Sequence, residues 1–407
     1  MKIYVKDDSN VRILDGSIDL DKFNIQIDVS PLSSKPQYVP SIEVLTTDNK
    51  KYTLINCSLS AYGSNRNYIY EYNAYIDEWY DLDKLKINSI YAEYNEIQYL
   101  ARKKRVSEGK GCFILSNEKI KEKIYENDIL SIEINEQPNV VDIEPNFHYD
   151  YHNTVKINYK NQLSFSDLFI ELRSIENILG FSLQQKMRLN NLVIIDSTNK
   201  ELHVMTKFIT KEKIETHPYI NDILFIQNVA RNYYEDDHFR IIIDGFYENI
   251  YNSLDLVFVF INMCNCIEVL GFCNGIEDGL KNNLDLIHNL RLQYDNKSPS
   301  DELKGISLKD ELFYFITYFR NITPDIKYNS FIHRINITRN YYVHGHSSKN
   351  IFSFDEIVLV NNYLRYLVFY VILVMCNEDA VILFFRDIIG KTLISIENKY
   401  LLQNNNE

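Results

Sequence analysis

The chain has 407 residues, of which 45% are hydrophobic and 24% are charged. This length and composition fit a globular protein of two ordinary domains, each with its own core, and exclude a disordered chain. The net charge of -13 argues against a protein that coats nucleic acid, because phosphate binding depends on clustered Lys and Arg.

Six cysteines are scattered along the chain, and no basic stretch followed by an apolar one opens it. We therefore expect a cytoplasmic protein without disulfides. The longest fully apolar run, residues 366–376, is shorter than the roughly 20 residues that cross a bilayer. We expect no membrane span.

The first 160 residues indicate β-structure, because apolar and polar residues alternate over segments such as 23–29, 130–134 and 155–159. A succession of such strands suggests a sandwich or a barrel. The four basic residues at 102–105 fall between two of the expected strands. A solvated loop is the simpler interpretation of them, and a surface for RNA or a partner is the alternative.

From about residue 164 the apolar period becomes helical. Ser164 and Asp167 form a capping pattern, and the helix that they open is expected to end at Gly180. Two strand-like segments, NNLVIID and ELHVMTKFI, follow this helix. We therefore expect a β-rich N-terminal domain over residues 1–238.

After residue 239 nearly the whole sequence indicates helices, and four or five of them form a bundle that we place at 239–395. Residues 396–407 are expected to be a polar C-terminal tail. The expected fold class is thus α+β multidomain, with a β-rich domain before an all-α bundle. The helix over 354–378 is apolar on most of its circumference, so it is either central or covered by a second subunit, and we favour a homodimer interface.

The octapeptide RNYYVHGH, residues 339–346, lies in a window without any Asp or Glu, residues 326–350. Gly345 follows His344 directly, and Gly is the usual left-handed residue just past a helix end, so His344 is expected on the last turn. Unpaired carbonyl groups and the helix dipole there favour the protonated imidazole. Such a histidine can accept and donate a proton near neutral pH.

On this helix Asn340 shares a face with His344, and the long side chain of Arg339 can bridge the ~7.5 Å to the histidine. A guanidinium beside a titrating imidazole suits a phosphodiester. The histidine moves the proton of a ribose 2′-hydroxyl or of the leaving oxygen, and the arginine stabilises the charge on phosphorus, so the substrate would be RNA. The alternative is that Arg and His fall at this spacing by chance and only cap a helix.

The stretch RNYYVHGH resembles the signature of the HEPN ribonucleases, in which four to six residues separate Arg from His. The layout is similar to the Apea-like branch of that group, and FINMCNCIEVLGF resembles a helix of the branch, with Glu268 at its acidic position. The resemblance implies a metal-independent endoribonuclease without a cofactor, catalytic roles for Arg339 and His344, and a supporting role for Asn340. It also implies a homodimer, products with a cyclic phosphate and a free 5′-hydroxyl, and anti-phage defence by abortive infection, with the N-terminal domain sensing a phage-derived trigger.

Four neighbouring residues are further candidates. His346 is either a second proton carrier or an exposed loop residue. Lys327, Arg334 and Lys349 could contact RNA. The near-repeat RNYYEDDH at 231–238 contains three acidic residues that would repel a phosphate and neutralise its arginine, so we interpret it as a structural turn held by salt bridges.

Two rival interpretations concern metals. His148, Asp150 and His152 alternate on one strand face and could ligate a metal. The cysteines at 264, 266 and 273 lie in an apolar stretch without a CxxC pair and are better explained as small buried residues than as zinc ligands. The alternative functions are a non-catalytic sensor or dimerisation protein and the toxin of a toxin-antitoxin pair.

Overall fold

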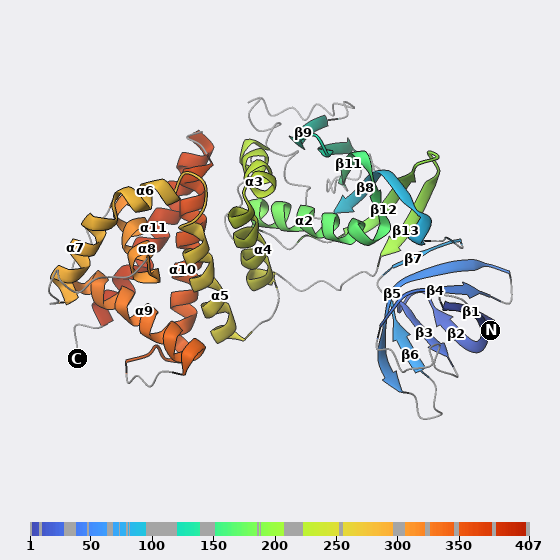
Figure 1. Cartoon of the computed structure of the whole chain (residues 1–407), viewed down its shortest axis with the longest axis horizontal. Coiled ribbons are helices and arrows are strands. Elements are labelled where there is room, and N and C mark those ends of the chain that lie inside the picture. The colour runs from blue at the N-terminus through green and yellow to red at the C-terminus, as the bar shows by residue number, and fades with distance from the viewer. Residues whose placement is uncertain are drawn as a thin grey trace, which may run out of the picture. The chain divides into compact units, whose positions relative to one another are not determined.

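A computed structural model describes most of the chain (Figure 1), namely residues 2–7, 10–27, 38–46, 49–62, 68–72, 74–78, 80, 82–94, 120–138, 151–184, 187, 189–206, 223–251, 255–295, 306–321, 326–345, 350–376 and 380–403. Contacts within the chain divide it into two units. The first unit comprises Met1–Glu176 and Met187–Glu215, and the second comprises Asn177–Lys186 and Thr216–Glu407. The predicted boundary at residue 238 therefore falls inside the second unit.

The first unit contains one antiparallel sheet, with thirteen strands among the described residues. The strands are β1 (Lys2–Asp7), β2 (Asn10–Asp19), β3 (Asn24–Ile27), β4 (Tyr38–Leu45), β5 (Lys51–Tyr62), β6 (Tyr68–Glu71), β7 (Ala74–Ile76), β8 (Lys86–Tyr94), β9 (Ile120–Glu126), β10 (Leu130–Pro138), β11 (Tyr151–Ser164), β12 (Leu189–Asp196) and β13 (Glu201–Thr206), and a short 3-10 turn, η1 (Leu82–Lys84), precedes β8. The order across the sheet is β1-β2-β3-β6-β5-β7-β13-β12-β8-β11-β10-β9, and β4 pairs with β5. The predicted β-rich N-terminal region is confirmed.

Alternating residues of these strands form the core, as the sequence pattern predicted. In β10, Ile132 and Ile134 are buried, and in β11, Val155 and Ile157 are buried opposite them. Strand β1 contacts β4 as well as pairing with β2, so the first six strands curl around a core of their own. The buried members of that core are Ile25, Ile27, Ile42, Val44, Tyr52, Leu54, Cys57, Tyr70 and Tyr72.

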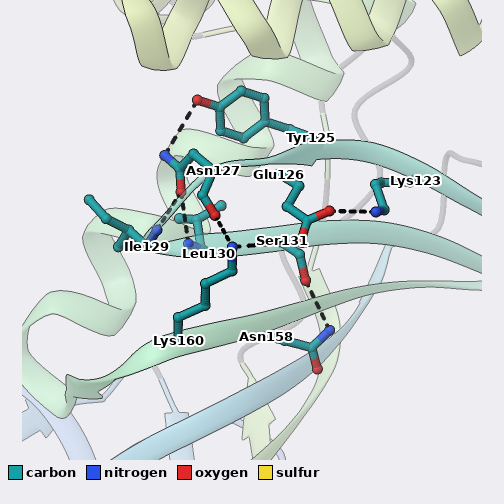
Figure 2. Close-up of polar contacts among 9 residues, drawn as sticks. All are labelled: Lys123, Tyr125, Glu126, Asn127, Ile129, Leu130, Ser131, Asn158 and Lys160. Carbon is teal, nitrogen blue, oxygen red and sulfur yellow. Dashed lines mark hydrogen bonds and ion pairs between the residues drawn. The ribbon is translucent and has the colours of Figure 1, made fainter.

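The turn between β9 and β10 is built on Asn127 (Figure 2). Its side-chain Oδ1 accepts hydrogen bonds from the backbone N–H groups of Ile129 and Leu130, both at 2.8 Å. The ammonium group of Lys160 on β11 donates to the backbone carbonyl of Asn127. The bonds to Asn127 Oδ1 close the turn and the Lys160 bond ties it to β11, so we assign these polar groups to the fold.

Helix α2 (Phe165–Leu183) begins just after Ser164, as the capping pattern predicted. The prediction that it ends at Gly180 is wrong. Phe181 is fully buried and its ring centroid lies 4.9 Å from that of Phe246, so tertiary packing extends the helix beyond the glycine.

The second unit is helical, and the predicted bundle is confirmed. Its elements are α3 (Ile223–Glu235), α4 (Asp237–Tyr251), α5 (Leu256–Leu270), α6 (Glu277–Asn282), α7 (Leu284–Asp295), α8 (Leu308–Tyr314), the π-helical turn η3 (Phe315–Phe319), α9 (Ile326–His344), α10 (Phe354–Met375) and α11 (Ala380–Gln403). Residues 396–403 were predicted as a polar tail but belong to α11, because Glu397 in this stretch is buried and forms an ion pair with Arg320.

Helix α10 packs against α5 and α11 (Figure 1). By length and composition it is long and apolar enough to cross a membrane, but 61% of its most apolar window is buried inside the protein, and the core helix of a bundle has the same properties. Burial within one chain accounts for most of the apolar circumference of α10, as the alternative of a central helix proposed. The homodimer stays a prediction.

Candidate functional site

The site lies at the C-terminal end of α9. The helix ends at His344, and the next residue, Gly345, has a φ of 68°, the left-handed conformation that glycine adopts most easily. The N–H of Gly345 donates to the carbonyl of Tyr341 at 3.0 Å and closes the last turn. The predicted position of His344 on this turn is confirmed, and its side chain is exposed.

The guanidinium of Arg339 connects three other predicted residues. Its Nη1 lies 3.3 Å from His344 Nε2 and donates to Asn340 Oδ1 at 3.3 Å. Its Nη2 donates to Glu268 Oε2 at 3.0 Å. The structure therefore brings together Arg339, Asn340, His344 and Glu268.

Burial differs within this group. The side chain of Arg339 is 20% exposed and that of Glu268 is 32% exposed, so their ion pair lies at the surface and not in an apolar core. The Nε of Arg339 is buried and has no hydrogen-bond partner among the described residues. Because the guanidinium has five N–H groups, donors remain on Nε and Nη2 beyond the three contacts described above.

Glu268 reaches Arg339 because α5 packs against both α9 and α10. The buried side of α5 includes Cys264, Ile267 and Leu270. Glu268 lies on the last turn between these apolar positions, so its backbone is fixed while its carboxylate points to α9. The negative end of the α5 dipole is an unfavourable place for a carboxylate, which increases the value of a cationic partner there.

The contact between Nη1 and His344 Nε2 defines the chemistry available. If Nε2 accepts this hydrogen bond, the imidazole is neutral and carries its proton on Nδ1. A neutral Nε2 is a base that can take a proton, and the cation next to it is placed to stabilise an anion that occupies the same space. The arrangement is therefore suited to proton transfer beside a phosphate.

Glu311 is a site neighbour that sequence reasoning missed. It lies on α8, where every residue from Leu308 to Tyr314 is buried, including Lys309 and Asp310. Burial raises the pKa of Glu311 to about 9, with smaller contributions from the negative charges of Glu268 and Asp310. No sequence signal distinguishes it, because acidic residues in a short helix with a capping box normally face solvent.

The other candidates lie apart from this group. Lys327 is exposed on the first turn of α9, about 18 Å along the helix from Arg339. Arg334 does not present a free charge for RNA, because Nη1 and Nη2 donate to the two carboxylate oxygens of Glu356, each at 2.8 Å, and the guanidinium covers the ring of Phe352. His346 and Lys349 lie outside the described residues.

The near-repeat at 231–238 contains a junction between helices: residues 231–235 belong to α3, residues 237–238 belong to α4, and the predicted turn is reduced to Asp236. Asp236 stands between α3 and α4, and its carboxylate accepts from the backbone N–H of His238 at 2.9 Å and of Asn274 at 2.8 Å. Asp237 pairs with Arg240 at 2.9 Å. The acidic residues thus contact His238 and Arg240, whereas the sequence predicted that they would neutralise Arg231.

The metal interpretations find no support in the described part of the chain, where no group of three His, Cys, Asp or Glu side chains could hold an ion. The cysteines at 264, 266 and 273 are free and buried, as predicted. Burial raises the pKa of each thiol, which disfavours the thiolate that binds zinc. His148 and Asp150 lie outside the described residues, and His152 pairs with Gln137 in the sheet.

Comparison with known families adds two matches. Residues 6–234 match a family model described as ApeA N-terminal domain 1, and residues 275–377 match one described as Apea-like HEPN. The first match ends near the predicted boundary at 238, and the second includes Arg339 and His344 but begins after Glu268. No curated protein and no solved structure gives a significant match to the chain.

Proposed function

Because the chain belongs to the family of ApeA proteins with an Apea-like HEPN domain, we propose that it is a metal-independent endoribonuclease that cleaves RNA with Arg339 and His344. The observation that carries this proposal is the 3.3 Å contact between Arg339 Nη1 and His344 Nε2 at the exposed end of α9. A permanent cation and a proton acceptor at this distance match the two needs of phosphodiester transfer to a neighbouring hydroxyl.

The cleavage step uses the ribose 2′-hydroxyl as nucleophile. His344 Nε2 takes the hydroxyl proton as the 2′-oxygen attacks phosphorus. The bond from phosphorus to the 5′-oxygen breaks, leaving a 2′,3′-cyclic phosphate on one product. The 5′-oxygen takes a proton, from the same histidine or from His344 of a second copy, and leaves as a free hydroxyl.

Arg339 stabilises the charge on the phosphate oxygens during this step. Its Nη1 contacts to Asn340 and His344 are long, at 3.3 Å, so a phosphate oxygen can replace them at low cost. The 3.0 Å bond from Nη2 to Glu268 is shorter and keeps the guanidinium in place meanwhile. Glu268 and Asn340 are therefore supporting residues.

We propose that the active form is a cytoplasmic homodimer joined through the helical bundle. Apolar side chains are exposed at this end of α9 and on the first turns of α10. Val343 is 41% exposed, Phe354 is 62% exposed and Val358 is 42% exposed. A second copy that covered them would bring two α9 ends together. The proposed biological role is anti-phage defence, with a phage-derived trigger bound by the β-rich unit.

The proposal is tested by incubating the purified protein with total RNA in EDTA, with His344→Ala and Arg339→Ala alongside. Cleavage that resists the chelator and is lost in both variants supports the proposal. The near-repeat supplies matched controls, since His238→Ala and Arg231→Ala remove the same residue types from the other RNYY stretch and should cleave like the wild type.

Two results would contradict the proposal. If His344→Ala cleaves as fast as the wild type, the proposed site is wrong. If the wild type cleaves no RNA with or without phage extract, the helical bundle has a non-catalytic role in sensing or dimerisation.

A further inference from the structure

Glu311 is a buried carboxyl group next to the site. It is 2% exposed, and its Oε2 has no hydrogen-bond partner among the described residues. It lies against the end of α5, since a Cβ atom added to Gly271 would be 2.6 Å from Glu311 Oε1. The φ of Gly271 is -61°, a backbone conformation that any residue adopts. Glycine is needed at this position because a larger side chain would clash with Glu311.

The surroundings of Glu311 favour its uncharged form. An ionised carboxylate there would be buried with no donor to Oε2 among the described residues, near the carboxylate of Glu268 and at the negative end of the α5 dipole. The nearby charges on α8 have partners elsewhere. Lys309 Nζ lies 3.3 Å from Nδ1 of His333 on α9, and Asp310 Oδ1 lies 3.5 Å from Nε2 of His288 on α7.

The charge of Glu311 matters to Arg339 through Glu268. With Glu311 neutral, the carboxylate of Glu268 is the anion that faces the guanidinium, and their 3.0 Å bond sets the direction of Nη1 toward His344. A second anion at Glu311 would repel the carboxylate of Glu268 and so disturb the ion pair that directs Nη1 toward His344.

We propose that Glu311 is a positioning residue of this site: its uncharged carboxyl group packs against the end of α5 that carries Glu268, and so keeps Arg339 aligned with His344. This inference rests on the proposed function for the role of Arg339 and His344 in cleavage, but the alignment itself can be measured without any activity.

The first test follows the ring resonance of His344 by NMR as pH rises, in the full chain and in Glu311→Gln, with His344→Ala used to assign the signal. Glutamine keeps the shape of the side chain and cannot ionise. The wild type should show a second inflection near pH 9, where Glu311 loses its proton and Arg339 shifts, and Glu311→Gln should lack it. Inflections shared by both proteins belong to other titrating groups. Absence of any difference between the two proteins overturns the proposal.

The second test measures cleavage. Glu311→Ala should lower kcat by about 10- to 100-fold with little change in KM, because the catalytic pair is misaligned and no substrate contact is lost. Glu311→Gln should restore the wild-type rate at pH 7.5 and keep it above pH 9, where the wild type declines. If the glutamine variant is as slow as the alanine variant, the positioning role is wrong.

These readouts separate two failures. A wild type that cleaves no RNA but shows the Glu311-dependent inflection at His344 overturns the nuclease proposal and supports the alignment. A wild type that cleaves RNA with the same pH profile as Glu311→Gln supports the nuclease proposal and overturns the role of Glu311.

Discussion

The charge state of Glu311 can be tested by stability alone. Its pKa is raised from an ordinary 4.5 to about 9, so the folded protein binds a proton that the unfolded chain has lost throughout this range. The contribution of this group to the free energy of unfolding is therefore fully present below pH 4.5 and is lost as pH rises toward 9. At about 1.4 kcal/mol per pH unit, the wild type loses about 3 kcal/mol by pH 7 and about 6 kcal/mol by pH 9.

Glu311→Gln removes this pH dependence because an amide does not titrate. The buried amide has a desolvation cost of its own, so the absolute difference in unfolding free energy is not predicted. The prediction concerns how that difference changes with pH. The unfolding free energy of the variant minus that of the wild type should rise by about 1.4 kcal/mol per pH unit between pH 5 and pH 8.

Urea unfolding followed by helical circular dichroism reports this change in the second unit. Glu277→Gln is the matched control, because Glu277 is an exposed carboxylate paired with Lys281. Its difference from the wild type should stay within about 1 kcal/mol at every pH. A difference for Glu311→Gln that does not change with pH would mean that Glu311 is ionised in the folded protein, contrary to this prediction.

Three other predictions follow from the helical unit. The side chains of Arg320 and Glu397 are each 2% exposed, so Glu397→Gln leaves Arg320 buried without its counter-charge. Thermal unfolding followed by helical circular dichroism should show that the free energy of unfolding falls by about 3–5 kcal/mol. Lys391→Ala, which breaks an exposed ion pair, is the control and should lower it by less than about 1 kcal/mol. Arg334→Ala should lower the melting temperature of the helical unit but leave the salt dependence of RNA binding unchanged, because this arginine is held inside the fold. Lys327→Ala should leave stability unchanged and, if this lysine contacts phosphate, reduce the salt slope of RNA binding by about one charge. An unchanged salt slope would mean that Lys327 does not contact RNA.

The parts of the site that depend on neighbours along the chain could be predicted from sequence. The glycine after His344 predicted the helix end, and the spacing from Arg339 predicted that its side chain reaches the imidazole. These follow from the geometry of one helix. The strands could be predicted for the same reason, since alternation identifies a buried face without knowledge of the partner strand.

The parts that depend on tertiary packing could not be predicted in this way. The family resemblance indicated Glu268 as an acidic position, but its contact with Arg339 could not be predicted from spacing, because the two residues lie on different helices. Arg334 looked available for RNA until the fold placed Glu356 opposite it. Glu311 gave no signal, since the burial of a whole charged helix turn is decided by the helices around it.

Attack by the ribose 2′-hydroxyl is tested by the products of one short oligoribonucleotide cleaved by the wild-type protein in EDTA, compared with the same oligonucleotide carrying a 2′-deoxy sugar at the cut position. We expect a 2′,3′-cyclic phosphate and a 5′-hydroxyl from the first substrate, no cleavage of the second, and no cleavage of either by His344→Ala. Cleavage of the deoxy substrate, or products with a 5′-phosphate, would rule out attack by the 2′-hydroxyl.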